Sequence, residues 1–241
     1  MKKPFEIIHE DEAIVVVNKA PFTLTIPDRY APEKYNLYHE LIKKFGEVYT
    51  VHRLDKETSG ILVFAKTEDA HKHLSHQFQK RTVEKIYLTL VAGAMHQEEG
   101  LIDKPLAPHQ HLQDRMVVSK HGKPSQTHFK VVELFKNFSL VEAEIKTGRT
   151  HQIRVHFESI GYPLAVDAIY GKKESLFLSE IKLRKFKLGK DQEERPLMTR
   201  SALHAFRLTL IHPTSEEKIS FEAPLPKDFK AVVAQLRKWG K

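Results

Sequence analysis

The chain contains the segment Val51-His52-Arg53-Leu54-Asp55-Lys56-Glu57-Thr58-Ser59-Gly60, which continues as Ile61-Leu62-Val63-Phe64-Ala65-Lys66. Its second half is an almost unbroken apolar run, which is typical of a buried strand. Asp55 stands among basic residues, just ahead of the turn that feeds this strand. Because a rigid strand would hold that loop in place, we treat Asp55 as a candidate catalytic carboxylate. The alternative is an ordinary turn residue that forms surface ion pairs with Arg53 or Lys56.

The composition limits the class of protein. The chain has 241 residues, and 41% of them are hydrophobic, which is enough for a packed core. The 39 Lys and Arg residues outnumber the 31 Asp and Glu residues, and the net charge of +8 favours a polyanionic partner, nucleic acid first. The absence of cysteine excludes disulfides, thiolate metal sites and a cysteine nucleophile. Without a signal-like or membrane-length apolar run, we expect a soluble cytoplasmic protein with no membrane partner.

Periodicity and turn residues predict a single α+β domain over residues 1–241. We expect strands at 5–9, 13–17, 61–66, 85–91, 126–135, 138–146, 202–211 and 219–223. We expect helices at 36–45, about 67–81 with Thr67 as N-cap, about 150–160 with Thr150 as N-cap, and 228–239. Residues 93–122 are expected to hold only short elements, and 176–195 are expected to form an insertion with one helix.

Five blocks of sequence, spread over nearly the whole chain, carry a second pattern. They are Asn18-Lys19 with a following Pro21, His52-Arg53-Leu54-Asp55 with Thr58-Ser59-Gly60, Lys85-Ile86-Tyr87, the run from Gly148 to His156, and Leu203-His204-Ala205 with His212-Pro213. In this order the blocks resemble those of the RluA-type pseudouridine synthases, which isomerise uridine within RNA. One departure is Ala20, since the family commonly places a proline directly after the lysine.

The resemblance implies both a fold and a reaction. The fold would be a mixed, largely antiparallel β-sheet core with flanking helices and a central RNA-binding cleft. The reaction breaks the N1–C1′ bond of uridine and joins C5 to C1′ without net redox change, so an isomerase that uses no cofactor is expected. No S4 module is expected in addition to the catalytic domain.

The resemblance also assigns catalytic roles. Asp55 would be the catalytic carboxylate, and Arg154 would be the arginine that keeps it ionised and oriented. Tyr87 would lie against the target base, where its ring stacks. Without the resemblance, Arg154 would be a surface helix residue and Tyr87 a half-buried strand tyrosine.

Four more residues are implied to bind the substrate. An enzyme that acts on a base within an RNA helix must first swing it out. Arg53 would fill the space vacated by that base, and Leu203 would form an apolar wall of the uracil pocket. Arg149 and His151 would contact phosphate or make structural hydrogen bonds.

The expected partner is a stem-loop of ribosomal or transfer RNA, bound by a monomer. Two basic groups are candidate phosphate contacts or else solvated charged faces: Lys72, Lys80 and Arg81 in the 67–81 helix, and Lys182, Arg184, Lys185 and Lys187 in the basic insert at about 172–199. No metal site is expected, because the spacing of His71, His73 and His76 scatters them around their helix.

Two alternatives stay open. One is a non-catalytic RNA-binding module with the same fold. The other is a glycosidase or nucleosidase, which needs a second carboxylate beside Asp55, and Glu57 is the near candidate in sequence.

Overall fold

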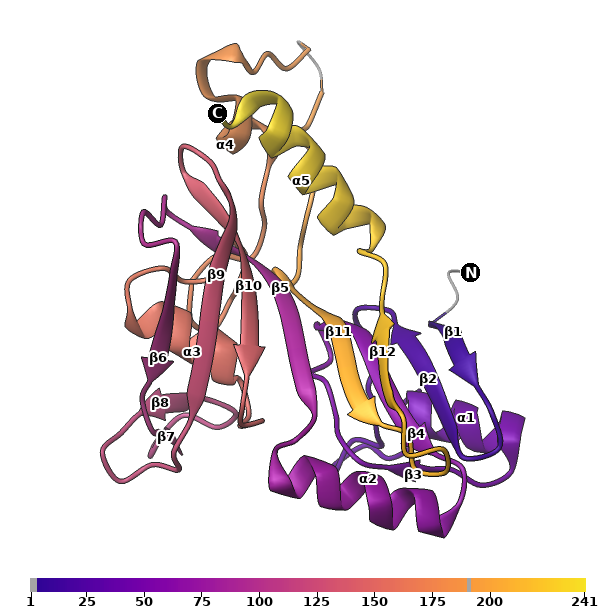
Figure 1. The fold of residues 1–241 in the computed structure, drawn as a ribbon. Helices are drawn as coiled ribbons and strands as arrows, with labels where there is room; N and C mark the ends of the chain where they lie inside the picture. The colour runs from indigo at the N-terminus through magenta and orange to yellow at the C-terminus, as the bar shows by residue number, and fades with distance from the viewer. Residues whose placement is uncertain (1–3, 190–191) are drawn as a thin grey trace. The chain divides into compact units, whose positions relative to one another are not determined.

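The computed structural model describes residues 4–189 and 192–241. Its contacts divide the chain into two compact units (Figure 1). Unit 1 comprises Met1–Tyr87 and His204–Pro224, and unit 2 comprises Leu88–Leu203 and Leu225–Lys241. Each unit is thus built from two separate lengths of chain. The expectation of one catalytic domain stays a prediction.

Unit 1 is built on a sheet in the order β1-β2-β4-β11, with β12 beside β11 and β3 beside β4. The strands are β1 (Phe5–Glu10), β2 (Ile14–Lys19), β3 (Tyr49–Thr50), β4 (Ser59–Ala65), β11 (Leu203–Ile211) and β12 (Lys218–Glu222). Every residue of β4 is buried, as its apolar run predicts. The β4–β11 pair is parallel, and the other pairs named here are antiparallel.

Two helices of unit 1 begin with a side-chain cap, and the sequence predicts one of these caps, Thr67. The side chain of Asn36 caps α1 (Leu37–Phe45), which ends at Gly46 in the left-handed region. The side chain of Thr67 accepts from the backbone of Ala70 at the start of α2 (Glu68–Lys80). In Figure 1, α2 packs against β3 and β4.

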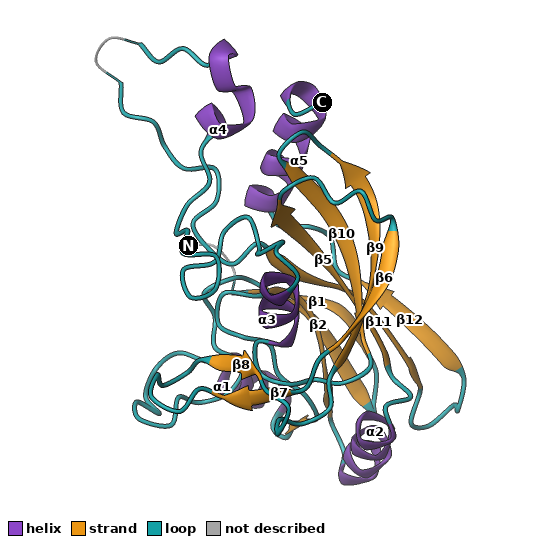
Figure 2. Ribbon diagram, turned by 90° about the vertical axis from the view of Figure 1, so that its left-hand side faces the viewer, coloured by secondary structure: helices purple, strands orange, loops and turns teal. Residues whose placement is uncertain are grey.

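Unit 2 has a sheet in the order β5-β10-β9-β6 and a separate β7-β8 pair. Its strands are β5 (Glu84–Ala92), which enters from unit 1, β6 (Glu99–Asp103), β7 (Leu106–Pro108), β8 (Met116–Val118), β9 (Gln126–Leu134) and β10 (Phe138–Ile145). Its helices are α3 (Gln152–Ser159), α4 (Leu178–Lys182), the 3-10 turn η1 (Leu183–Lys185) and α5 (Lys227–Trp239). Helix α3 packs against β8 and β9 (Figure 2).

Helix α5 closes the core of unit 2. Its apolar face, with Phe229, Val233 and Leu236, packs into one cluster with Leu90 of β5 and Leu140 of β10. This is the terminal amphipathic helix that the sequence predicts.

The predicted element types agree with the structure, and the α+β class with a largely antiparallel sheet is confirmed. One predicted cap is wrong. Helix α3 begins after His151, which adopts a left-handed conformation and makes no capping hydrogen bond with its side chain, rather than after Thr150. The helix ends where expected, with Gly161 at φ +85° just past it.

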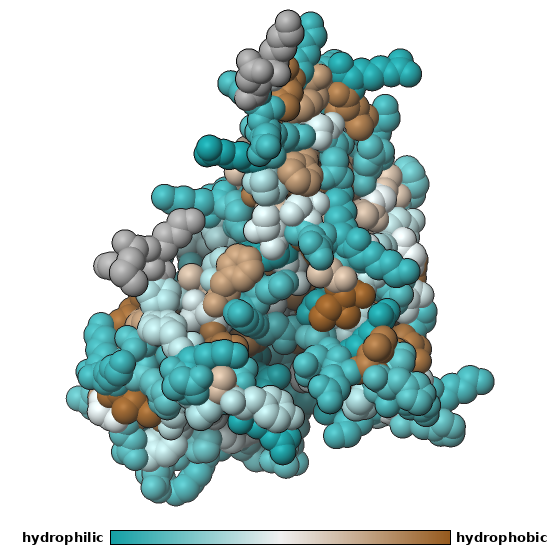
Figure 3. Space-filling model, turned by 180° about the vertical axis from the view of Figure 1, so that it is seen from behind, coloured by the Kyte–Doolittle hydropathy of each residue, from teal (hydrophilic) through white to brown (hydrophobic). Residues whose placement is uncertain are grey.

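Hydrophilic side chains cover most of the face drawn in Figure 3, and hydrophobic ones form small separate patches on it. None of the helices in residues 4–189 and 192–241 combines the length and the hydrophobicity of a membrane-spanning segment.

A close backbone approach joins β4 to β11. Gly60 adopts φ +116°, and a Cβ atom placed there would lie 2.1 Å from the carbonyl oxygen of Ala205. Beside it, the hydroxyl of Ser59 and Nδ1 of His204 are 3.0 Å apart. The Ser-Gly and His-Ala pairs of two distant sequence blocks are therefore one structural feature.

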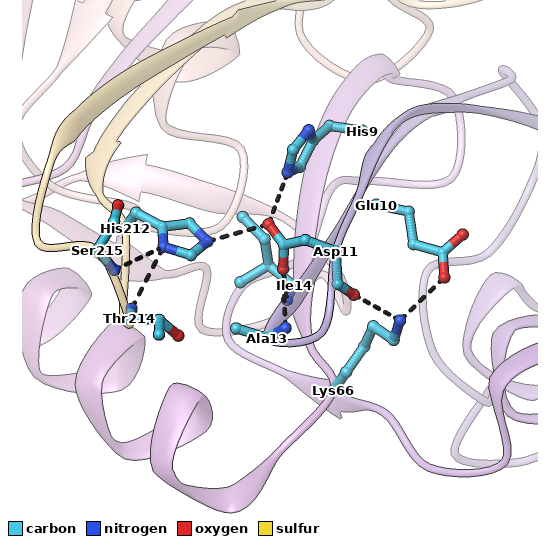
Figure 4. Close-up of polar contacts among 9 residues, drawn as sticks. All are labelled: His9, Glu10, Asp11, Ala13, Ile14, Lys66, His212, Thr214 and Ser215. Carbon is cyan, nitrogen blue, oxygen red and sulfur yellow. Dashed lines mark hydrogen bonds and ion pairs between the residues drawn. The ribbon is translucent and has the colours of Figure 1, made fainter.

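A hydrogen-bond network in unit 1, which we call the Asp11 brace, centres on the carboxylate of Asp11 (Figure 4). It accepts hydrogen bonds from the backbone of Ala13 and Ile14 and lies 2.7 Å from Nε2 of His9 and 3.0 Å from Nε2 of His212. The backbone amides of residues 214 and 215 donate to Nδ1 of His212, so Nε2 carries the proton toward Asp11. The brace ties the β1–β2 turn to the β11–β12 turn.

We expect Gly60→Ala to lower the free energy of unfolding by more than about 3 kcal/mol, because rigid backbone occupies the space and the φ angle suits only glycine. Gly46→Ala is the matched control. Gly46 also has positive φ but nothing within 4 Å, so backbone strain alone should cost about 1–2 kcal/mol. Urea unfolding measures both, and equal losses would contradict the close approach.

The Asp11 brace predicts a pH dependence. Burial raises the pKa of Asp11, but the hydrogen bonds from His9, from the Ile14 and Ala13 backbone and from His212 outweigh it and lower the pKa from 3.8 to about 2. A depressed carboxyl pKa stabilises the fold above the unfolded value and loses that effect as the pH falls through the folded value. The difference in unfolding free energy between wild type and Asp11→Asn should therefore be full at pH 5 and vanish between about pH 4 and pH 2. A difference that is constant over this range would contradict it.

Candidate active site

Asp55 lies in the loop between β3 and β4 and is half-buried. Its carbonyl accepts from the backbone of Thr58 at 3.1 Å, which closes the turn into β4. The hydroxyl of Thr25 donates to the carbonyl of Leu54 at 2.9 Å, and the Leu54 amide lies 3.2 Å from the same hydroxyl oxygen. The backbone just before the carboxylate is thus held from both sides.

A buried lysine holds the other side of this loop. The ammonium of Lys19 is fully buried and donates to the carbonyls of Ala20, Thr23 and Lys56 at 3.1, 2.8 and 3.2 Å. Burying a charge is costly unless hydrogen bonds replace its water. The first sequence block therefore anchors the Asp55 loop, a role that the sequence did not reveal.

His52 is a neutral structural residue. Its ring stacks on Phe78 at 4.7 Å between centroids, and its Nε2 accepts from the backbone of Val63 at 3.1 Å. Burial, helped by the nearby charge of Lys85, lowers the pKa of His52 to about 3. At neutral pH the ring is an uncharged acceptor that fixes the loop against β4.

Tyr87 belongs to the same unit as Asp55 and is 8% exposed. Its pKa is raised well above the usual 10, first by burial and then by the negative charge of Asp55. The structure therefore brings this predicted pair of site residues within electrostatic reach of each other. The Tyr87 phenol keeps its proton at neutral pH.

Arg53 is exposed on the Asp55 loop, with its side chain toward solvent rather than in the core. Leu203 is 4% exposed, and its carbonyl accepts from the guanidinium of Arg200 at 3.1 Å. Arg200 is itself fully buried and forms a double hydrogen bond with Asp228 at 2.7 and 3.1 Å. The position of Leu203 is thus fixed within unit 2 by a buried arginine whose ionic partner, Asp228, is half-buried.

Arg154 of α3 is buried in unit 2 and paired with Asp167. Its Nε and Nη2 donate to the two carboxylate oxygens at 2.6 and 2.9 Å. Its guanidinium also lies 5.0 Å from the ring centre of Tyr170. Burial opposes the charge of Asp167, but the hydrogen bond and the charge of Arg154 outweigh it and lower the pKa of Asp167. The guanidinium is therefore held in one orientation. Because Asp55 and Arg154 belong to different units, their pairing stays a prediction.

Tyr170 links His151 to the β7–β8 pair. Its hydroxyl lies 2.9 Å from Nδ1 of His151 and accepts from the backbone of Met116 at 2.9 Å. The guanidinium carbon of Arg115 lies 5.6 Å from the ring centre of Tyr170. His151 and Arg154 therefore both contact Tyr170.

Arg149 lies at the edge of this network. Its backbone amide donates to the side chain of Gln152 at 3.1 Å, and Gln152 in turn binds Thr147 and Thr127. Within residues 4–189 and 192–241, the Nε atom of Arg149 is buried without a hydrogen-bond partner. Because buried donors are rarely left unpaired, this N–H group is suited to donate a hydrogen bond to an acceptor atom of a substrate.

Sequence reasoning missed Lys19, Asp167 and Tyr170. A usable signal exists for Asp167, because it interrupts the apolar run Leu164-Ala165-Val166, where a buried carboxylate requires a cationic partner. For Lys19 the signal is weaker, since many strands end in an exposed lysine. As for metal ligands, the described part of the chain contains no group of three or more suitable side chains.

Comparisons with known proteins give the family and agree with the fold. The family described as RNA pseudouridylate synthase matches residues 13–159. The chain is 36% identical to ribosomal large subunit pseudouridine synthase D of Nitrosomonas europaea, over 97% of this chain and 66% of that protein. It is 38% identical to the protein of the same name in Neisseria meningitidis serogroup B, over 96% of this chain and 61% of that protein. An uncharacterized RNA pseudouridine synthase of Bacillus subtilis is 35% identical, over 98% of this chain and 74% of that protein.

Solved structures give the same result. The human RNA pseudouridylate synthase domain containing 1 superposes with a TM-score of 0.70 at 27% identity, covering 92% of this chain and 84% of that one. The human RNA pseudouridylate synthase domain containing 4 superposes with a TM-score of 0.74 at 24% identity, covering 96% of this chain and 92% of that one. At this identity the likeness shows only the fold. The chain belongs to the RNA pseudouridylate synthase family. It spans only about two thirds of the length of the first two curated relatives.

The Arg154–Asp167 pair predicts that removing a buried carboxylate destabilises unit 2 much more than removing an exposed one. Asp167→Asn should lower the free energy of unfolding by about 3–5 kcal/mol, because it leaves a buried guanidinium without its counter-ion. Asp103→Asn, which removes an exposed carboxylate in the same unit, should change stability by less than about 0.5 kcal/mol. Urea unfolding measures the free energy of unfolding of both variants. Similar values for the two variants would show that Asp167 does not hold Arg154.

Proposed function

We propose that this protein is an RNA pseudouridine synthase that isomerises uridine without a cofactor. One observation carries the proposal. In a chain of this family, the carboxylate of Asp55 stands on a loop fixed by buried hydrogen bonds, within electrostatic reach of the buried Tyr87. A rigid acid beside an aromatic ring suits chemistry on a flipped nucleoside.

The reaction needs little more than a positioned acid. The N1–C1′ bond breaks, the uracil turns, C5 bonds to C1′, the C5 proton is lost and N1 gains one. Atoms and electrons balance without an oxidant or a transferred group. Asp55 attacks the sugar, adds to the base, or removes a sugar proton, and each route requires the ionised carboxylate close to the nucleoside.

Tyr87 contributes as a neutral phenol. Its raised pKa keeps the proton on the oxygen, so the group offers a ring for stacking and a hydroxyl for a hydrogen bond rather than a ready base. Stacking on one base is worth about 1–3 kcal/mol. This stabilises the base outside the RNA helix after flipping.

Arg154 completes the proposed site as the ionic partner of Asp55. A guanidinium already oriented by Asp167 and Tyr170 loses little side-chain entropy when it meets a second carboxylate. Such a partner would keep Asp55 ionised when RNA excludes water from it.

The remaining predicted residues bind the RNA. Arg53, exposed beside Asp55, would fill the space that the flipped base leaves, and Leu203 would form an apolar wall against the uracil. Arg149 and His151 would contact the substrate next to Arg154. The buried Nε of Arg149 supports that role.

We favour ribosomal RNA over transfer RNA as the substrate, since two of the relatives are named for the large ribosomal subunit. Such a substrate implies action in the cytoplasm. We keep the expectation of a monomer.

Asp55→Asn is the decisive variant. We expect pseudouridine formation, followed as tritium release from C5-labelled uridine in RNA, to fall by at least about 10³-fold. RNA affinity should stay within about threefold, because one carboxylate facing RNA adds little to binding. Glu57→Gln is the control and should retain activity.

The same assay separates the alternatives. Wild-type protein that binds RNA but releases no tritium would favour a non-catalytic RNA-binding module. Free uracil among the products, together with loss of activity in Glu57→Gln, would favour a nucleosidase with two carboxylates.

A further inference from the structure

The surface at the end of α5 gathers three lysines around one aromatic ring. The ammonium groups of Lys182, Lys238 and Lys185 lie 4.7, 5.2 and 5.8 Å from the ring centre of Trp239. They come from two segments, since α4 and η1 belong to the basic insert and Lys238 belongs to the last turn of α5. All these residues lie in unit 2, where α4 packs beside the end of α5 (Figures 1 and 2).

Three acidic residues that belong to α4 or bond to α4 or α5 are engaged elsewhere. Glu180 accepts from the backbone of Phe177 and pairs with Lys173. Glu133 pairs with Arg237, and Glu194 accepts from the backbone of Ser179 at 2.8 Å. Over the described residues, no ion pair involves Lys182, Lys185 or Lys238.

Further positive charge surrounds this group. Residues 181–189 hold four basic residues and no acidic one, and Arg184 and Lys187 among them are exposed. The backbone of Lys136, in the β9–β10 turn, donates to the carbonyl of Gly240 at 2.7 Å and adds another exposed lysine beside the helix end. The dipoles of two helix ends favour basic residues there, but they do not require them to face one ring.

Each ammonium gains from the ring face, while the three repel one another. A polyanion relieves that repulsion and releases its own counter-ions. Trp239 itself is half-buried because it also packs against the core of unit 2, so the three ammonium groups are the main contacts available to a polyanion.

We propose that Lys182, Lys185 and Lys238 around Trp239 form an accessory RNA-binding surface that contacts backbone phosphates of the substrate away from the target uridine. This inference rests on the proposed function, because it takes RNA as the polyanion. It gives the basic insert a role in affinity for long RNA rather than in the chemical step.

Trp239 provides a direct readout, because it is the only tryptophan in the chain. Adding large-subunit ribosomal RNA from cells that lack the protein should change its fluorescence, and salt should reverse the change. The experiment uses the full chain, both wild type and Asp55→Asn, so the result does not depend on turnover. RNA that binds by anisotropy without changing the Trp239 emission would overturn the proposal.

The variant K182Q/K185Q/K238Q tests the contribution to affinity. We expect the Kd for this RNA to rise about tenfold or more and the slope of log Kd against log salt to decrease by about two to three. The kcat at saturating RNA and the affinity for a uridine pentanucleotide should stay within about twofold, since neither needs distant phosphates.

The matched control is K130Q/K227Q/K230Q, which removes the same charge from three exposed lysines of unit 2. It should affect the Kd by less than about threefold and the salt slope by less than about one. Equal losses in the two triple variants would mean that only net charge matters and would overturn the proposal. An emission change with polyglutamate but not with RNA would also overturn it, in favour of an acidic protein partner.

The two proposals fail separately. If wild-type protein makes no pseudouridine, the catalytic proposal fails while the fluorescence and salt data still decide the accessory surface. If pseudouridine forms normally but the two triple variants bind RNA alike, only the accessory surface fails.

Discussion

The fold of unit 1 depends on the close contact between β4 and β11 at Gly60 and Ala205. This contact brings together side chains that are 145 residues apart in sequence, since Ser59 lies against His204. Only a residue without a Cβ atom permits the backbones to approach so closely. The contact fixes the start of β4, and the start of β4 fixes the loop that carries Asp55. Loss of this packing would therefore displace the acid even though no group at Gly60 takes part in chemistry.

Buried cations with dedicated partners position the rest of the site. Lys19 binds three backbone carbonyls, Arg154 binds Asp167, and Arg200 binds Asp228. Burying each charge costs desolvation free energy, and its partner offsets this cost only in one geometry. These pairs therefore specify where a segment lies more than they add stability. By contrast, the lysines around Trp239 have a ring as their common neighbour, which leaves their charge directed at a partner outside the chain.

Much of the local structure could be predicted because it depends on neighbours in sequence. The 36–45 helix, the cap Thr67, the apolar run of β4 and the β9–β10 hairpin all formed where expected. The cap of α3 did not, since His151 takes the left-handed conformation and turns its ring to the Tyr170 hydroxyl. A contact with a residue outside the helix overrode the local preference for Thr150.

The amino-acid order alone was enough to predict the class of fold, the family resemblance and Asp55 as the candidate acid, because periodicity and motifs depend on residues that are adjacent in the chain. The packed fold was needed to show that Lys19 anchors the Asp55 loop, that Asp167 orients Arg154 and that His52 is neutral. The reason is physical. Burial, and with it the need of a charge for a partner, arises only when distant segments pack and exclude water.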